Sequence, residues 1–115
     1  MEELAVAAMM QNVDVSTQVV LSLQGSFERN VVRYQCDGLE PFAVDFINAE
    51  PNFLAIVPIG PRKMVFVNVI SASGAKYVSG EFEWWNKGSD ATLHNVTEGL
   101  DAAPVLTCSE NVQTP

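Results

Sequence analysis

Apolar and polar residues alternate along most of this chain in short runs, which is the pattern of half-buried β-strands. In residues 30–36, Val32, Tyr34 and Cys36 fall on one face and polar side chains on the other. Helical character is confined to residues 2–11. The pattern predicts strands over residues 17–23, 30–36, 42–48, 53–57, 63–70, 76–79, 81–85, 91–96 and 105–108.

Glycine and proline separate these runs at short intervals, for example at Pro51 and at Gly60 with Pro61. The strands follow one another too closely for crossover helices, so the sheet must be antiparallel. We therefore predict an all-β fold, a small antiparallel eight-stranded β-barrel, with a sandwich as the alternative. Residues 17–115 would form this domain, and residues 1–16 a flexible segment or a remnant of a processing region.

The net charge of the chain indicates which kinds of binding partner it favours. Acidic residues outnumber basic ones by 14 to 6, giving a net charge of −8 over 115 residues, of which 48% are apolar. Such a surface disfavours nucleic acid and anionic membranes, which attract basic patches. It favours a basic protein partner, although solubility alone would also account for it.

Two cysteines, Cys36 and Cys108, bear on the compartment. They are too far apart for a C-x-x-C motif, and one histidine cannot complete a metal site with them. A disulfide would imply an oxidising compartment; two buried thiols are the alternative. No apolar run reaches the length of a membrane span. Residues 1–10 are apolar like part of a signal peptide but carry Glu2 and Glu3, so we expect the export signal to have been removed.

Two turn sequences carry the candidate chemistry, residues 71–77 (SASGAKY) and residues 84–88 (WWNKG). Ser73 and Lys76 match the S-x-x-K nucleophile motif, but that motif works on a helix, and the β pattern and Gly74 disfavour one. The single histidine, His94, is read as a surface residue. We therefore expect no enzyme, no cofactor and no metal. A slim hydroxyl-bearing turn is better suited to entering the active site of another protein.

Four segments together resemble the bacterial inhibitors of c-type lysozyme. These are VRYQCDG at 32–38, SASGAKY at 71–77 with the family's Ser-Gly-x-x-Tyr signature, WNKG at 85–88 followed by Ala91, and TCS at 107–109. They occur in order over about residues 30–110. Each motif is weak alone, whereas four in register are specific.

The resemblance implies an eight-stranded barrel pinned by a Cys36–Cys108 disulfide, and protection of peptidoglycan from host lysozyme in the periplasm. Ser73 would hydrogen-bond the catalytic carboxylates of lysozyme, and Lys87 would lie near the acidic residues of its cleft. Tyr77 would pack beneath the loop. The residues implied to bind the partner are Ala72, Ser73, Gly74, Lys76, Tyr77, Lys87 and Gly88. Lysozymes of this type are strongly basic, so the negative charge would steer association.

Some alternatives stay open. Lipid-anchored members of the family need an additional cysteine at the mature N-terminus, and this sequence contains only Cys36 and Cys108. We therefore expect the soluble periplasmic form without a membrane anchor. The leading residues 1–25 could supply a barrel strand or mediate a homodimer. The alternative function is a small periplasmic barrel that binds an apolar ligand or an envelope component, although we expect a filled interior.

Overall fold

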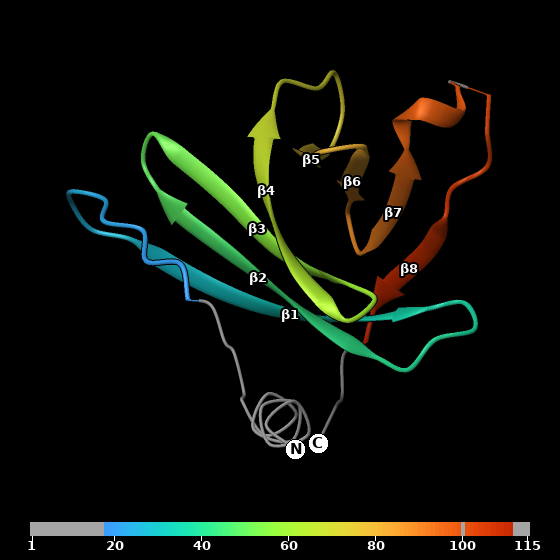
Figure 1. The fold of residues 1–115 in the computed structure, drawn as a ribbon, viewed down its shortest axis with the longest axis horizontal. Helices are drawn as coiled ribbons and strands as arrows, with labels where there is room; N and C mark the ends of the chain where they lie inside the picture. The colour runs from blue at the N-terminus through green and yellow to red at the C-terminus, as the bar shows by residue number, and fades with distance from the viewer. Residues whose placement is uncertain (1–17, 100, 112–115) are drawn as a thin grey trace, which may run out of the picture.

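The computed structural model describes residues 18–99 and 101–111, and these fold as a closed antiparallel barrel of eight strands in chain order (Figure 1). The predicted barrel is confirmed, and the sandwich is excluded. The strands are β1 (Glu28–Cys36), β2 (Phe42–Ala49), β3 (Asn52–Ile59), β4 (Arg62–Val69), β5 (Ala75–Ser79), β6 (Phe82–Lys87), β7 (Asp90–Asn95) and β8 (Leu106–Glu110).

Pairing of the first and last strands closes the barrel. Tyr34 lies opposite Glu110, and Cys36 lies opposite Cys108 in this antiparallel ladder. The two cysteines form a disulfide across 72 residues of sequence, which confirms the predicted pairing. Pairing with β8 covers Tyr34, Gln35 and Cys36, so this end of β1 is not a free edge, whereas residues 28–33 form a ladder with β2 alone.

Large side chains fill the barrel interior. Trp84, Tyr34 and Phe66 are almost completely buried, and Val44, Val57 and Leu93 pack with them. Trp84 points inward and its neighbour Trp85 remains half-buried outside, as expected for adjacent residues of a strand. An open apolar cavity of about 520 Å³ lies at one mouth of the barrel, between residues 39–42, 58–60, 82, 93 and 105–106. The centre is therefore packed, as the sequence led us to expect.

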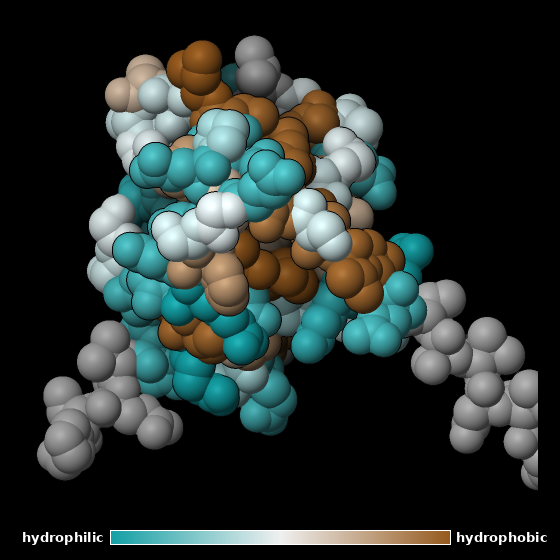
Figure 2. All heavy atoms as spheres, turned by 90° about the vertical axis from the view of Figure 1, so that its left-hand side faces the viewer, coloured by the Kyte–Doolittle hydropathy of each residue, from teal (hydrophilic) through white to brown (hydrophobic). Residues whose placement is uncertain are grey.

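The strand predicted over residues 17–23 is wrong for residues 18–23, which form no strand. This segment joins none of the eight strands, although residues 28–33 of β1 form a ladder with β2 alone. Its apolar residues are consequently exposed, with Val19 80% and Val20 75% accessible. Figure 2, which faces the side of the barrel on the left of Figure 1, shows apolar patches among polar ones. Self-association through this segment stays a prediction.

The strand predicted over residues 91–96 ends one residue early. The side chain of Asn95 accepts a hydrogen bond from the backbone N–H of Thr97 and starts a short 3₁₀-helix, Val96–Glu98. No helix in residues 18–99 or 101–111 is long and apolar enough to cross a membrane. The helical character predicted for residues 2–11, and the segment 1–16 as a whole, lie outside the described residues.

Candidate functional site

The two turns singled out in the sequence lie next to each other at one end of the barrel. Residues 70–74 connect β4 to β5, and residues 88–89 connect β6 to β7. The closest approach is at Gly74, where an added Cβ would fall 2.2 Å from the backbone oxygen of Asn86 and 3.1 Å from Cγ of Lys87. Gly74 also has a φ of +65°, which other residues adopt at a cost. The serine loop and the lysine turn therefore form one surface.

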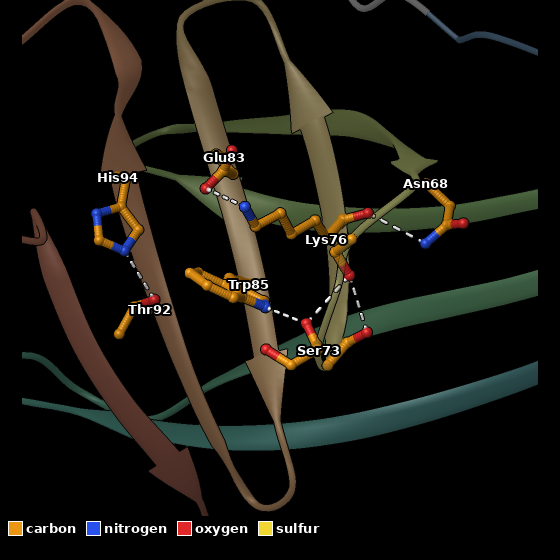
Figure 3. A network of polar contacts seen from close by, with 9 residues as sticks. Asn68, Ser73, Lys76, Glu83, Trp85, Thr92 and His94 are labelled. Carbon is orange, nitrogen blue, oxygen red and sulfur yellow. Dashed lines mark hydrogen bonds and ion pairs between the residues drawn. The ribbon is translucent and has the colours of Figure 1, made fainter. Parts of the chain in front are cut away.

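Side-chain hydrogen bonds hold the serine loop in its shape. The Ser71 hydroxyl donates to the carbonyl oxygens of Ser73 and Gly74, at 3.1 and 3.0 Å. The indole Nε1–H of Trp85 donates to the same Ser73 carbonyl at 2.9 Å. Figure 3 shows the Ser73 side chain pointing away from these bonds. Ala72 and Ser73 are exposed, and Ser73 lies between the small residues Ala72 and Gly74.

Two lysines converge on the ring of Trp85. The Nζ atom of Lys87 lies 3.6 Å from the ring centroid, and that of Lys76 lies 4.0 Å from it. Both are cation–π distances. Lys76 is half-buried and also lies 4.0 Å from a carboxylate oxygen of Glu83, an ion pair visible in Figure 3. Lys87 is exposed. Two of the six basic residues of an acidic chain thus meet beside the serine loop.

A buried polar network supports the end of β6 that carries Lys87. Nε1 of Trp84 donates to Oδ1 of Asn86 at 2.9 Å, and Nδ2 of Asn86 donates to the Tyr34 hydroxyl at 2.7 Å. Burial raises the pKa of Tyr34 to about 12, so its hydroxyl stays neutral and accepts from Asn86 at ordinary pH. The network ties β6 to β1 across the barrel and fixes the strand next to the site.

Tyr77 lies in the barrel core, with its ring centroid 5.6 Å from that of Phe46 in β2. Burial raises its pKa. The hydrogen bonds that hold the loop come from Ser71 and Trp85 rather than from Tyr77. Sequence reasoning missed this role of Trp85 and the role of Asn86. Their positions in the sequence could have indicated both roles. Trp85 and Asn86 directly precede Lys87 in a strand, where Trp85 shares the face of Lys87 and Asn86 shares the face of Trp84.

The remaining candidate chemistry finds no support in the geometry. Ser73 lies in a loop and Lys76 in β5, so their S-x-x-K spacing does not place them on a helix face. His94 is half-buried and its Nε2 lies 3.0 Å from the Thr92 hydroxyl. Within residues 18–99 and 101–111, no group of three or more histidine, cysteine, aspartate or glutamate residues is placed to hold a metal ion.

An antiparallel barrel that displays two exposed, preformed turns at one end is typical of a protein-binding module. The family model of the membrane-bound lysozyme inhibitors of c-type lysozyme, MliC, matches residues 34–101 of the chain. The chain belongs to this family. The predicted family is thereby confirmed, and it is a family of inhibitors rather than of enzymes.

Two relatives carry the name membrane-bound lysozyme inhibitor of C-type lysozyme. The one from Pseudomonas aeruginosa is 42% identical over 80 residues, 69% of this chain and 63% of the relative. The one from Cupriavidus necator is 41% identical over 75 residues, 65% of this chain and 60% of the relative. The chain thus spans less than two thirds of both relatives.

A solved structure extends the similarity to three dimensions. It is the crystal structure of Pseudomonas aeruginosa MliC in complex with hen egg white lysozyme, 37% identical in sequence, with a TM-score of 0.69. The match covers 85% of this chain and all of the other. The barrel is therefore the fold of that inhibitor.

Proposed function

We propose that this chain inhibits c-type lysozyme by inserting the Ser73 loop and the Lys87 turn into the active-site cleft of the enzyme. The observation that carries the proposal is the close approach of the serine loop to Asn86 and Lys87 at Gly74, which brings the exposed Ser73 and Lys87 to one surface. Family membership and the neighbouring inhibitor–lysozyme structure support it. The residues proposed to bind are Ala72, Ser73, Gly74, Lys76, Tyr77, Lys87 and Gly88, with Tyr77 acting from the core.

The chemistry of the partner suits this surface. A retaining glycosidase uses two carboxyl groups about 5–5.5 Å apart, one protonated and one ionised. The Ser73 hydroxyl can donate a hydrogen bond to the carboxylate and accept one from the carboxylic acid. The Lys87 ammonium adds a charge-assisted bond to an acidic group of the cleft. The inhibitor would thus occupy both catalytic carboxyl groups and exclude the polysaccharide.

Preformation of the loop favours tight binding. Ser71, Trp85 and the close packing at Gly74 fix the loop before the partner arrives. Less conformational entropy is then lost on association, so more of the contact energy appears as affinity.

We place this activity in the bacterial cell envelope, and in the periplasm as the finer proposal. The relatives are named membrane-bound, which associates those proteins with the envelope. The Cys36–Cys108 disulfide suits an oxidising compartment such as the periplasm. There the inhibitor would protect peptidoglycan from lysozyme of an animal host.

The experiment is turbidimetric lysis of bacterial cell walls by a c-type lysozyme, titrated with the disulfide-bonded protein and with Ser73→Asp. We expect the parent to inhibit and the variant to lose inhibition, because it brings a carboxylate against the carboxyl groups of the cleft. Circular dichroism should show the same β signal for both, since Ser73 is exposed. Absence of inhibition by the folded parent would refute the proposal, and equal inhibition by the variant would remove Ser73 from the site.

A further inference from the structure

The side chain of Trp85 contacts both halves of the candidate site. Its indole N–H binds the Ser73 carbonyl at 2.9 Å, and its ring lies 3.6 Å from Nζ of Lys87. Figure 3 shows the indole lying across β6 with its nitrogen toward Ser73. The position of the serine loop and the position of the Lys87 ammonium therefore both depend on contacts with one rigid side chain.

We propose that Trp85 is a positioning residue that sets the spacing between the Ser73 hydroxyl and the Lys87 ammonium for a partner carrying paired carboxyl groups. The proposal rests on the proposed function and deepens it. A flexible lysine has many rotamers, and a ring beneath its ammonium restricts them. The hydrogen bond from the indole N–H to the Ser73 carbonyl likewise restricts the conformations of the loop.

The geometry also assigns different roles to the two lysines. Lys76 lies against the same ring but is half-buried and paired with Glu83 at 4.0 Å. It therefore has an acidic partner within the chain, and it supports the ring from the side of β5. Lys87 is exposed, and among residues 18–99 and 101–111 no ion pair to it is found. Trp85 thus directs Lys87, rather than Lys76, toward the partner.

Two variants separate the two contacts. Trp85→Phe removes the N–H donor and keeps a ring beneath Lys87, whereas Trp85→Leu removes both. We expect the inhibition constant for a c-type lysozyme to rise roughly two- to tenfold for Trp85→Phe. Loss of the ring should add roughly a further two- to fivefold for Trp85→Leu. Phe82→Leu, at the other end of β6, is a control that changes an aromatic side chain packed against the barrel core, and at equal concentrations of folded protein it should inhibit like the parent.

The same variants in a Lys87→Ala background distinguish positioning from simple support of the fold. The cost of losing the N–H should persist there, because it acts on the loop. The additional cost of losing the ring should disappear, because its cation is gone. A ring that only stabilised the barrel would cost the same in both backgrounds, and this result would overturn the proposal.

Nuclear magnetic resonance of the free protein tests the inference without lysozyme. The side-chain methylene protons of Lys87 should be shifted upfield by the Trp85 ring and should lose that shift in Trp85→Leu. The amide protons of the loop should exchange faster in Trp85→Phe. If the parent failed to inhibit lysozyme while these shifts were present, the proposed function would fall and the positioning would stand. Unshifted Lys87 resonances with unchanged loop exchange would refute the positioning.

Discussion

At the scale of single residues, the site depends on one position without a side chain. An added Cβ at Gly74 would meet the backbone oxygen of Asn86 at 2.2 Å, a distance that real Cβ atoms do not reach. Backbone atoms cannot swing aside as the end of a flexible side chain can. The absence of a side chain at Gly74 is therefore what brings the loop against β6.

Gly74→Ala should displace the loop and strongly reduce inhibition of c-type lysozyme. Its control is Gly80→Ala, because Gly80 has a similar φ of +55° but no atom within 4 Å of an added Cβ. We expect both variants to lose about 1–2 kcal/mol of stability from the positive φ. Only Gly74→Ala should lose inhibition and an additional increment of stability. Thermal unfolding and the lysis assay measure the two effects, and equal behaviour of the variants would contradict this reading.

At the scale of elements, β6 gathers most of the determinants of the site. Trp84 and Asn86 belong to the buried network, and Trp85 and Lys87 belong to the outer surface. The alternation of the strand separates structural support from partner contact. This division makes the two sets of residues separately testable.

Lys87→Ala should weaken inhibition by about 1–3 kcal/mol, the range of a charged hydrogen bond. Lys76→Ala is the matched control from the neighbouring strand β5, because Lys76 contacts the same ring but is paired with Glu83. Its effect on inhibition should be smaller than that of Lys87→Ala. The test is to measure the inhibition constants of both variants at matched concentrations of folded protein. A larger loss of inhibition for Lys76→Ala than for Lys87→Ala would reverse the assigned roles.

The buried Tyr34 hydroxyl, which links β1 to β6, should make the free energy of unfolding fall at alkaline pH. Burial raises the pKa of Tyr34 from its ordinary 10.0 to about 12, so the unfolded chain loses this proton first as the pH rises. The contribution of Tyr34 is complete below pH 10 and is lost as the pH approaches 12. It amounts to about 2–3 kcal/mol of unfolding free energy.

Denaturant unfolding at several pH values from 9 to 12 measures this slope. Tyr34→Phe should be less stable at neutral pH, because Asn86 loses its partner, but should show a shallower decline. Tyr77, the other tyrosine, also has a raised pKa through burial and contributes to the slope that remains. An identical decline in the parent and in Tyr34→Phe would argue against the raised pKa of Tyr34.

The apolar pattern of the sequence, alternating in some strands and nearly continuous in others, predicted β1 to β8 because burial of strand residues is a property local to the sequence. The segment 18–23 shows where this reasoning stops. Its apolar residues have strand propensity, but a strand also needs a neighbour, and residues 18–23 pair with none of the eight strands. The role of Trp85 was missed for a related reason. Its contact with Ser73 depends on the register of β5 against β6, which a single sequence does not reveal.

At the scale of the whole molecule, the disulfide and the net charge act on different stages of function. The Cys36–Cys108 bridge joins the strands that close the barrel and restricts the unfolded chain across 72 residues of sequence. The bridge therefore stabilises the barrel that carries the two turns. We expect the charge of −8 to act earlier, before the surfaces meet.

This charge should accelerate encounter with a basic lysozyme, since opposite fields raise association rates more than they lower dissociation rates. Raising the ionic strength from about 0.01 to 0.5 M shortens the Debye length from roughly 30 Å to a few ångströms. The association rate constant should then fall roughly tenfold or more. The dissociation rate constant should change less, because the proposed contacts of Ser73 and Lys87 would be shielded from solvent in the complex. Surface plasmon resonance resolves both constants. A salt-independent association rate would mean that the acidic surface serves solubility alone, and the two turns would then account for recognition without help from the overall charge.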